Sequence, residues 1–355
     1  PGCCRCNPLH PNSILFLYRR STGSENSAAS LHGSHQQRSP ASDPSVWQYH
    51  FEKSDPICWC RTGVFPGRCG KIYEDVDLKK ITSYKLKGKA KCVIIPNDQK
   101  GLINLFDYIK KNNLKYKIIG GGSNLIFDGD YDGILIRLDK FDHLKIEDTK
   151  IVVGAGYNLI RLALKCARNS LTGLEFATGI PGTVGGAIVN NAGAYKSDMG
   201  YIVEEVLVIT PELEIKKLYN RDLNFHYRTS FFKENKDYII LQATIVLKRG
   251  KKDAIMAVIE DRKKRRIMSQ PLDFPSAGSV FRNPVNNFAG KLIEDIGYKG
   301  KNEGGAKVSE KHANFIINTG DATGKDIIKL IEEIKEKVKK EYDIDLILEQ
   351  EIVRW

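Results

Sequence analysis

From residue 71 onward, apolar residues recur at the two spacings that are typical of helices and strands. The helical spacing predicts helices over residues 101–113, 159–168, 253–268 and 326–340. In the third of these helices, Ile255, Val258 and Ile259 are expected to face inward. Continuous or alternating apolar runs predict strands over residues 116–119, 133–138, 151–153, 203–209, 238–247 and 346–353. Because these elements intermingle without a regular strand–helix–strand repeat, we expect an α+β fold with more than one lobe.

Residues 1–70 have a different composition from the rest of the chain. They hold six of the eight cysteines, seven of the 13 prolines and a single lysine, Lys53. The clustered cysteines lack the C-x₂-C spacing of zinc sites, so no metal is expected. We interpret this segment, which begins with Pro rather than Met, as a disordered or foreign leader without an assigned function. Beyond it only Cys92 and Cys166 remain, which favours a reducing cytoplasm.

The net charge of +12 favours anionic partners. After residue 70 the chain still has 48 basic against 39 acidic residues, a balance of +9. The run Arg262-Lys263-Lys264-Arg265-Arg266 is the one signal that resembles a nucleic-acid site. It ends a predicted helix, where cations complement the helix dipole, and it lacks interleaved aromatic residues. We therefore interpret it as a solvated helix face. No apolar run approaches 18 residues, so no membrane-spanning helix is expected.

Two glycine-rich segments are candidates for phosphate binding. Glycines let backbone N–H groups converge on a phosphate oxygen, and hydroxyl groups add further donors. Neither segment has the G-x-G-x-x-G pattern or the P-loop pattern, so each alone could be a structural turn. Together they favour a dinucleotide ligand. The candidate residues are Gly120, Gly121, Gly122, Ser123, Asn124, Gly179, Ile180, Pro181, Gly182, Thr183, Gly185 and Gly186.

An arginine surrounded by rings is a candidate for carboxylate binding. Arg228 lies in the segment Phe225-His226-Tyr227-Arg228-Thr229-Ser230-Phe231-Phe232. Its planar guanidinium could form two charge-assisted hydrogen bonds to a carboxylate. The alternative is an ordinary cation–π cluster on the surface.

Two further segments carry candidate proton-transfer groups. Ser279 lies in the segment 275–284, which lacks a nucleophile elbow and an evident activating histidine. If this serine is chemical, it should donate a proton or bind a ligand rather than become acylated. In the expected terminal strand, Glu349 and Glu351 would share one face because they are two residues apart. The strand pattern does not choose between them.

Taken together, the chain from about Val76 to its end resembles the UDP-N-acetylenolpyruvoylglucosamine reductase family, and within it the shorter type II branch. The markers occur in the family's order, and the set as a whole is specific. The chain departs from the family in two places: residues 1–70 have no family counterpart, and the family has a double glycine where this chain reads Leu86-Lys87-Gly88-Lys89. The markers are Thr82–Lys85, Gly121–Leu125, Leu174–Gly186, Tyr227–Ser230, Pro275–Pro284, Gly305–Phe315 and Leu348–Ile352.

The resemblance implies a flavin-binding fold of the vanillyl-alcohol-oxidase (PCMH) type. It would comprise two FAD-binding lobes, residues 71–138 and 139–250, and a smaller α+β substrate domain, residues 251–355. It implies non-covalent FAD, NADPH as co-substrate, and reduction of the enolpyruvyl ether of UDP-N-acetylglucosamine to UDP-N-acetylmuramate. The enzyme would be a cytoplasmic bacterial protein of peptidoglycan precursor synthesis, and we expect a monomer that binds neither nucleic acid nor membrane.

The resemblance also implies roles for individual residues. Arg228 would bind the substrate carboxylate, Ser279 would protonate a carbanion, and Glu351 would be the catalytic carboxylate. Such a carboxylate, close to a developing anion, must be protonated or polarise a proton donor. The residues implied to contact the substrate are Tyr227, Asn283 and His312.

Two other functions are compatible with parts of the sequence. The first is a different flavin oxidoreductase of the same fold, such as a sugar or alcohol oxidase. It would need no set of Arg228, Ser279 and Glu351, and air would rapidly reoxidise it. The second is a nucleotide-binding or RNA-binding protein that uses the basic run and contains no flavin.

Overall fold

The structure is a computed structural model that describes residues 69–355. The predicted leader therefore lies outside the described residues, except for its last two positions. Within the described residues, no helix is long and apolar enough to cross a membrane.

The first lobe is built on a four-stranded sheet. Its strand order is β1-β2-β5-β3, in which β5 runs parallel to both β2 and β3, and β1 is antiparallel to β2. The bounds are β1 Gly70–Asp77, β2 Lys89–Pro96, α1 Gln99–Lys111, β3 Tyr116–Ile119 and β5 Tyr131–Arg137. The helix α1 begins at its cap Asp98, whose carboxylate accepts from Gly101 N at 2.7 Å. Its face of Leu102, Leu105 and Phe106 packs into the main core.

The second lobe is built on a five-stranded antiparallel sheet in the order β12-β11-β13-β7-β6. Its strands are β6 Leu144–Glu147, β7 Lys150–Gly154, β11 Val203–Ile209, β12 Ile215–Tyr219 and β13 Ile239–Val246. The helices are α2 Leu159–Arg168, α3 Val184–Val189 and α4 Phe231–Glu234. Short strand pairs complete it: β8 Leu171–Thr172 with β14 Lys248–Arg249, and β9 Gly193–Ala194 with β10 Ser197–Asp198. One continuous core joins this sheet to the first.

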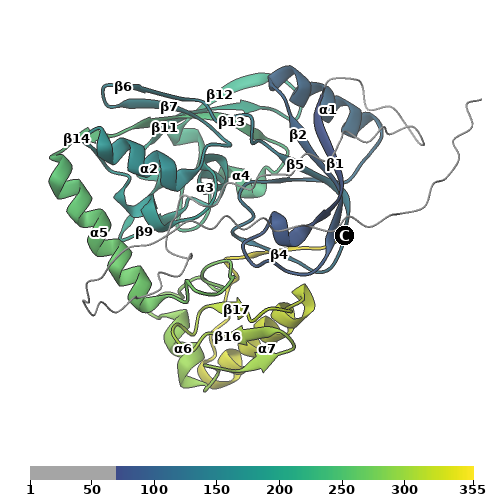
Figure 1. The fold of residues 1–355 in the computed structure, drawn as a ribbon, viewed down its shortest axis with the longest axis vertical. Helices are drawn as coiled ribbons and strands as arrows, with labels where there is room; N and C mark the ends of the chain where they lie inside the picture. The colour runs from purple at the N-terminus through teal and green to yellow at the C-terminus, as the bar shows by residue number, and fades with distance from the viewer. Residues whose placement is uncertain (1–68) are drawn as a thin grey trace, which may run out of the picture. The chain divides into compact units, whose positions relative to one another are not determined.

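The C-terminal part has its own core around a small antiparallel sheet, as the green and yellow segments of Figure 1 show. Its elements are α6 Ala289–Asp295, β15 Asn302–Glu303, β16 Ala306–Val308, β17 Ile316–Asn318 and α7 Gly324–Tyr342. The helix α5 Lys252–Ser269 precedes this part and packs on α2 of the second lobe. The long helix α7 begins with a capping box formed by Thr323 and Asp326. It buries Ile327, Ile331 and Ile334 against the sheet.

The chain then returns to the first lobe. Its last strand, β18 Glu351–Val353, pairs in parallel with β4 Leu125–Phe127, which directly follows the first glycine-rich segment. Figure 1 shows this yellow strand beside β4. The pairing brings Glu349 and Glu351 next to the first glycine-rich segment, residues 120–124, where Glu351 N donates to Asn124 O at 2.9 Å. More than 200 residues separate the two segments in the sequence.

The predicted elements are largely confirmed. The strands over 116–119 and 203–209 and the helix over 159–168 have the predicted bounds, and the helix predicted over 253–268 is one residue longer at each end. The expectation of an α+β fold is confirmed. The domain boundaries after residues 138 and 250 stay predictions.

Two details were wrong. Val258 does not face inward, because α5 buries only a narrow stripe of Ile255 and Ile259 against Ala167, and Val258 is 41% exposed. The terminal strand covers residues 351–353 rather than 346–353. Residues 346–350 instead lie alongside the Ser279 segment, residues 275–284. An isolated antiparallel bridge between Leu348 and Phe281 joins the two.

Candidate active site

The first glycine turn, residues 120–124, connects β3 to β4. Gly122 has φ = +62°, a left-handed conformation that glycine adopts with little strain. A Cβ at this position would lie 2.1 Å from the carbonyl oxygen of Ile81. The close approach is held by Ser83, whose backbone N and Oγ each donate to Gly122 O at 3.1 Å. This position therefore requires glycine.

The second glycine turn, residues 179–186, packs directly on the first. Gly182 has φ = +128°, and its Cα would lie 2.9 Å from a Cβ placed on Gly121. The hydroxyl of Ser123 donates to the carbonyl oxygen of Pro181 at 2.9 Å. The structure thus brings together the two segments that the sequence marked separately. The other candidates in these turns are Gly120, Asn124, Gly179, Ile180, Thr183, Gly185 and Gly186.

The backbone donors of these turns fit a phosphate ligand. Within residues 69–355, the N–H groups of Gly121, Gly122 and Ser123 have no hydrogen-bond acceptor, and neither do those of Gly182 and Thr183. Unpaired N–H groups in adjoining glycine turns form a concave site for phosphate oxygens. The residues present therefore fit the pyrophosphate of a dinucleotide such as FAD.

Arg228 is held in one orientation by three neighbours. It sits at φ = +56° in a tight turn that His226 and Thr229 close by backbone hydrogen bonds. Its Nε donates to Glu349 Oε1 at 2.7 Å, and its Nη2 donates to Gly193 O at 2.8 Å. The guanidinium also lies 5.1 Å from the ring centre of Tyr227. The cation–π contact is therefore present, and the carboxylate that Arg228 contacts is that of Glu349. That Arg228 also binds a ligand carboxylate stays a prediction.

The two terminal glutamates have different partners. Glu349 binds Arg228, and both side chains are 22% exposed. Glu351 forms a salt bridge with Lys117 of β3 at 2.7 Å. Glu349 also reaches two other parts of the site through its backbone. Its carbonyl oxygen accepts from Asn124 Nδ2 at 3.0 Å, and its N–H donates to Val280 O at 2.9 Å.

Ser279 lines a cavity of about 320 Å³ in the C-terminal part. Both residues that were predicted to contact the substrate from this part, Asn283 and His312, line it as well. Three lysines and an aromatic ring that the sequence did not single out complete the walls, and Phe288 is 71% exposed. The further lining residues are Phe288, Gly290, Lys291, Glu294, Lys299, Lys311, Ala313 and Asn314.

His312 is held as a neutral ring at pH 7. Burial lowers its pKa below the usual 6.5, and the positive charge of Lys299 lowers the pKa further. Its Nδ1 accepts from Asn314 N at 3.2 Å, so the neutral ring carries its proton on Nε2. The nearby Asn283 uses its Oδ1 to accept from Ala289 N at 3.1 Å, which leaves its amide NH₂ as a donor.

Two further cations lie beside Arg228 and the glutamates. Burial lowers the pKa of Lys233, the charge of Arg282 lowers it further, and Glu351 and Glu349 oppose these effects. Lys233 therefore lies within electrostatic reach of both glutamates. The Nε of Arg282 is buried and has no hydrogen-bond partner in the described part of the chain. An unpaired donor beside a second cation is suited to an anionic ligand.

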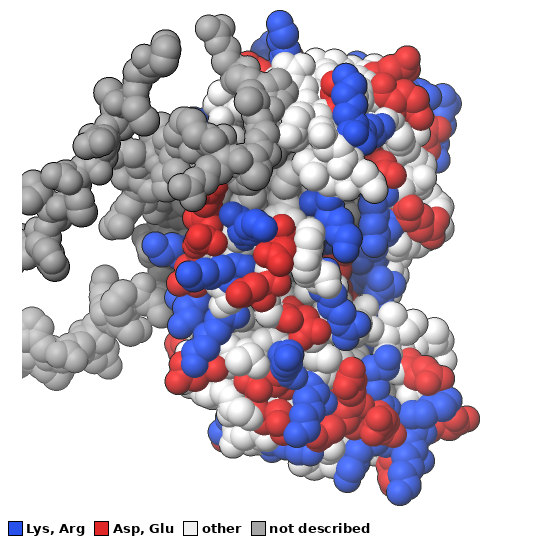
Figure 2. Space-filling view, turned by 90° about the vertical axis from the view of Figure 1, so that its right-hand side faces the viewer, with Lys and Arg blue, Asp and Glu red and all other residues white. Residues whose placement is uncertain are grey.

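The basic run does more than form the solvated face that we expected. Arg262 lies 4.6 Å from the ring centre of Tyr195. Arg266 packs on the second glycine turn. Its side chain lies so close to Gly179 that a Cβ added to this glycine would be 2.5 Å from the Cδ atom of Arg266. Arg265 conforms to the expectation, in an exposed ion pair with Asp261. On the face shown in Figure 2, basic and acidic side chains are interspersed.

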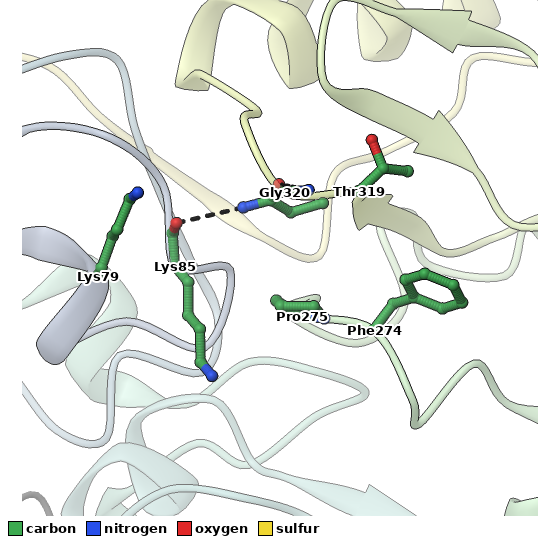
Figure 3. Close-up of a pocket in the computed structure, with 7 residues that line it drawn as sticks. Lys79, Lys85, Phe274, Pro275, Thr319 and Gly320 are labelled. Carbon is green, nitrogen blue, oxygen red and sulfur yellow. Dashed lines mark hydrogen bonds between the residues drawn. The ribbon is translucent and has the colours of Figure 1, made fainter. Parts of the chain in front are cut away.

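A second cavity, of about 310 Å³, contains none of the predicted site residues. Figure 3 shows its two lysines on one wall and Phe274 and Pro275 on the other. Its Asn318 joins the walls by donating to the carbonyl oxygens of Tyr84 and Lys85, at 2.9 and 3.2 Å. The lining residues are Lys79, Lys85, Phe274, Pro275, Asn318, Thr319 and Gly320.

Sequence reasoning missed Lys117, Lys233 and the lysines of the Ser279 cavity. Lys117 is one polar residue within an apolar strand, which was the only local signal. The cavity lysines are scattered through a lysine-rich segment, so their spacing carries no information. At no point among residues 69–355 are three or more His, Cys, Asp or Glu side chains grouped to hold a metal ion.

Comparison with known proteins gives matches to both halves of this site. Residues 90–219 match the model of an FAD binding domain, and residues 270–353 match that of the UDP-N-acetylenolpyruvoylglucosamine reductase C-terminal domain. The UDP-N-acetylenolpyruvoylglucosamine reductase of Bacillus velezensis is 41% identical over 286 residues, which cover 80% of this chain and 94% of the relative. The enzyme of that name from Caldanaerobacter subterraneus is 44% identical over 285 residues, with the same coverage.

A solved structure agrees with these matches. The crystal structure of UDP-N-acetylenolpyruvylglucosamine reductase from Thermus caldophilus is 31% identical and superposes with a TM-score of 0.67. The match covers 80% of this chain and 98% of the Thermus chain.

Proposed function

This chain belongs to the UDP-N-acetylenolpyruvoylglucosamine reductase family, and from that premise we propose that Arg228, Ser279 and Glu351 carry the family's reaction. The protein is an FAD-dependent oxidoreductase that reduces the enolpyruvyl ether of UDP-N-acetylglucosamine to UDP-N-acetylmuramate, with NADPH as reductant. The expected flavin-binding fold is confirmed. The family match sets aside both alternatives, the oxidase and the flavin-free RNA-binding protein.

One observation carries the assignment of the site. Glu349 contacts the first glycine turn through Asn124, the carboxylate-binding candidate Arg228, and the Ser279 segment through Val280. Groups that would bind a cofactor, a substrate carboxylate and a reacting carbon therefore meet around one residue.

The two glycine turns would hold the pyrophosphate of FAD on their unpaired N–H groups. When bound, FAD supplies hydride transfer from NADPH to the vinyl CH₂ carbon of the substrate. The adjacent substrate carbon then carries negative charge, which is shared with the substrate carboxylate. The remaining task of the protein is to stabilise that charge and to deliver a proton.

Arg228 is placed to stabilise the charge. A guanidinium has five N–H donors, and two of them are used by Glu349 and Gly193. The other three can bind the substrate carboxylate, whose charge grows as the hydride arrives. Because Arg228 is already oriented, little reorganisation is needed, and removing such a donor typically costs about 10²–10³ in rate.

Ser279 is proposed to donate the proton to the substrate carbon. A neutral hydroxyl is a poor acid toward water but suffices for a carbanion, so the absence of a histidine partner is no obstacle. Glu351 is proposed as the catalytic carboxylate of this step, either protonated or polarising a proton donor that bridges it to the substrate. Its salt bridge with Lys117 offsets a negative charge that would otherwise oppose the developing anion.

The walls of the Ser279 cavity are proposed to bind the nucleotide end of the substrate. Lys291, Lys299 and Lys311 supply positive charge for its diphosphate. The exposed ring of Phe288 offers a surface for the base. Asn283 and His312 offer neutral donors, and Tyr227 would flank the carboxylate beside Arg228.

A steady-state assay tests the proposed function. The purified protein should carry FAD, and it should oxidise NADPH only when the enolpyruvyl nucleotide is present, with a product two mass units heavier than the substrate. Oxidation of NADPH at the same rate without the nucleotide would contradict the proposal.

We further propose a cytoplasmic monomer without affinity for nucleic acid, to be checked by fractionation, light scattering and RNA binding.

A further inference from the structure

A buried amide connects the Ser279 segment to the first lobe. Gln350 is 3% exposed, and its Nε2 donates to the carbonyl oxygens of Ala277 and Gly278, at 3.1 and 3.0 Å. Its Oε1 accepts from the hydroxyl of Tyr84 at 3.0 Å. Three hydrogen bonds therefore satisfy both polar atoms of a side chain that the proposed chemistry does not use.

The two carbonyl groups that Gln350 holds belong to the residues directly before Ser279. Gly278 has φ = +77°, and a Cβ there would meet nothing within 4 Å, so no neighbour packs against the side-chain position of this residue. On the other side of Ser279, Val280 N donates to Asn314 O at 2.9 Å. The Ser279 hydroxyl itself has no hydrogen-bond partner within residues 69–355, so its backbone alone locates it.

The amide is itself held in a single orientation. Tyr84 is fully buried, and burial raises the pKa of its hydroxyl, which therefore stays protonated and donates. The Tyr84 carbonyl oxygen accepts from Asn318 Nδ2 at 2.9 Å, which anchors this tyrosine to the C-terminal part. With the Tyr84 hydroxyl as a donor on Oε1, the NH₂ group of Gln350 must face the two carbonyl oxygens.

We propose that Gln350 is a positioning residue that sets the place of the Ser279 hydroxyl relative to the reacting carbon, with Tyr84 as its anchor. The inference rests on the proposed function, since it assumes that Ser279 donates a proton. Gln350 lies between Glu349, which binds Arg228, and Glu351, which binds Lys117. One short segment thus orients both the carboxylate-binding group and the proton donor.

The two half-reactions of the FAD-loaded protein test this role in a rapid-mixing experiment. Gln350→Met, which keeps the volume and removes all three hydrogen bonds, should leave flavin reduction by NADPH within about twofold. It should slow flavin reoxidation by the enolpyruvyl nucleotide by roughly 10- to 100-fold, because small misplacements of a reacting group are costly. The apparent affinity for the nucleotide should change little, and the solvent deuterium isotope effect on reoxidation should rise.

Tyr84→Phe provides a second measure, because it keeps the ring in place and removes only the anchor of the amide. We expect it to slow the same half-reaction less than Gln350→Met does. The double variant should be no slower than Gln350→Met alone, since both changes act through one chain of contacts. Gln242→Met is the matched control, because this amide on β13 bonds His143 at 2.9 Å and has no part in the proposed chemistry.

The outcomes separate the two proposals. Equal slowing of both half-reactions by Gln350→Met or Tyr84→Phe, or an unchanged rate of reoxidation, would overturn the positioning role. If the unsubstituted protein, once reduced by NADPH, were not reoxidised by the enolpyruvyl nucleotide, the proposed function and the role of Gln350 would both be overturned.

Discussion

The proposed cofactor side and the proposed proton-donor side of this site use different parts of the polypeptide. The two glycine turns offer backbone N–H groups, and each turn is continuous in sequence. The other side depends on side chains from separate segments, among them Arg228, Ser279 and Glu351. Binding by a site of backbone N–H groups is therefore weakened by substitutions that add atoms to a glycine. A site made of side chains loses activity when a substitution removes one of its functional groups. This contrast predicts different failures on the two sides.

The largest effect is expected at Ser279. Ser279→Ala should leave flavin reduction by NADPH near normal and slow reoxidation by the enolpyruvyl nucleotide by about 10²–10⁴, the usual contribution of a positioned general acid. Rapid mixing under anaerobic conditions separates the two steps. Equal damage to both steps would show that Ser279 has a structural rather than a chemical role.

On the cofactor side, the largest effect should come from adding a methyl group. Gly122→Ala places a Cβ 2.1 Å from Ile81 O at a positive φ, and we expect a loss of FAD together with about 2–4 kcal/mol of stability. Titration with FAD and thermal unfolding measure the two effects. Gly297→Ala is the control, since its φ is +73° but nothing lies within 4 Å of the new atom. Its cost should be about 1 kcal/mol, without loss of FAD. Similar losses in both variants would argue against a close-packed turn.

A smaller effect is expected from Glu349, which accepts a hydrogen bond from Arg228 and is proposed to orient it. Glu349→Leu should slow reoxidation roughly tenfold, equivalent to the loss of one charge-assisted hydrogen bond of about 1.5 kcal/mol. Glu349→Gln retains an acceptor for Arg228 Nε and should recover most of the rate. Glu351→Gln should be slower than Glu349→Gln in the same assay, and the reverse order would move the catalytic role to Glu349.

The smallest effect concerns His312. Because burial lowers its folded-state pKa, the unfolded chain binds more protons there than the folded chain does as the pH falls below 6.5. The stability associated with the neutral ring is thus fully present above pH 6.5 and is lost as the pH falls toward the folded-state pKa. Melting temperatures between pH 8 and 5.5 should fall more steeply for the unsubstituted protein than for His312→Gln. Parallel curves would contradict the assignment.

The same contrast explains what could be predicted from the sequence. Glycine turns and periodic elements such as the helix over 159–168 are local patterns, and the structure confirms that both turns exist and meet. The roles of Lys117 and Gln350 depend on partners more than 70 residues away, and no local spacing encodes those. The terminal strand was predicted too long because alternation alone does not show which neighbour a segment pairs with. Residues 346–350 lie alongside the Ser279 segment, and only residues 351–353 pair with β4 as a strand.

The most direct measurement of the central claim is the reoxidation half-reaction of the unsubstituted protein. The FAD-loaded protein is reduced with one equivalent of NADPH without oxygen and then mixed with the enolpyruvyl nucleotide. The account predicts rapid return of the oxidised flavin absorbance and formation of one equivalent of UDP-N-acetylmuramate. A flavin that stays reduced until air is admitted would contradict it.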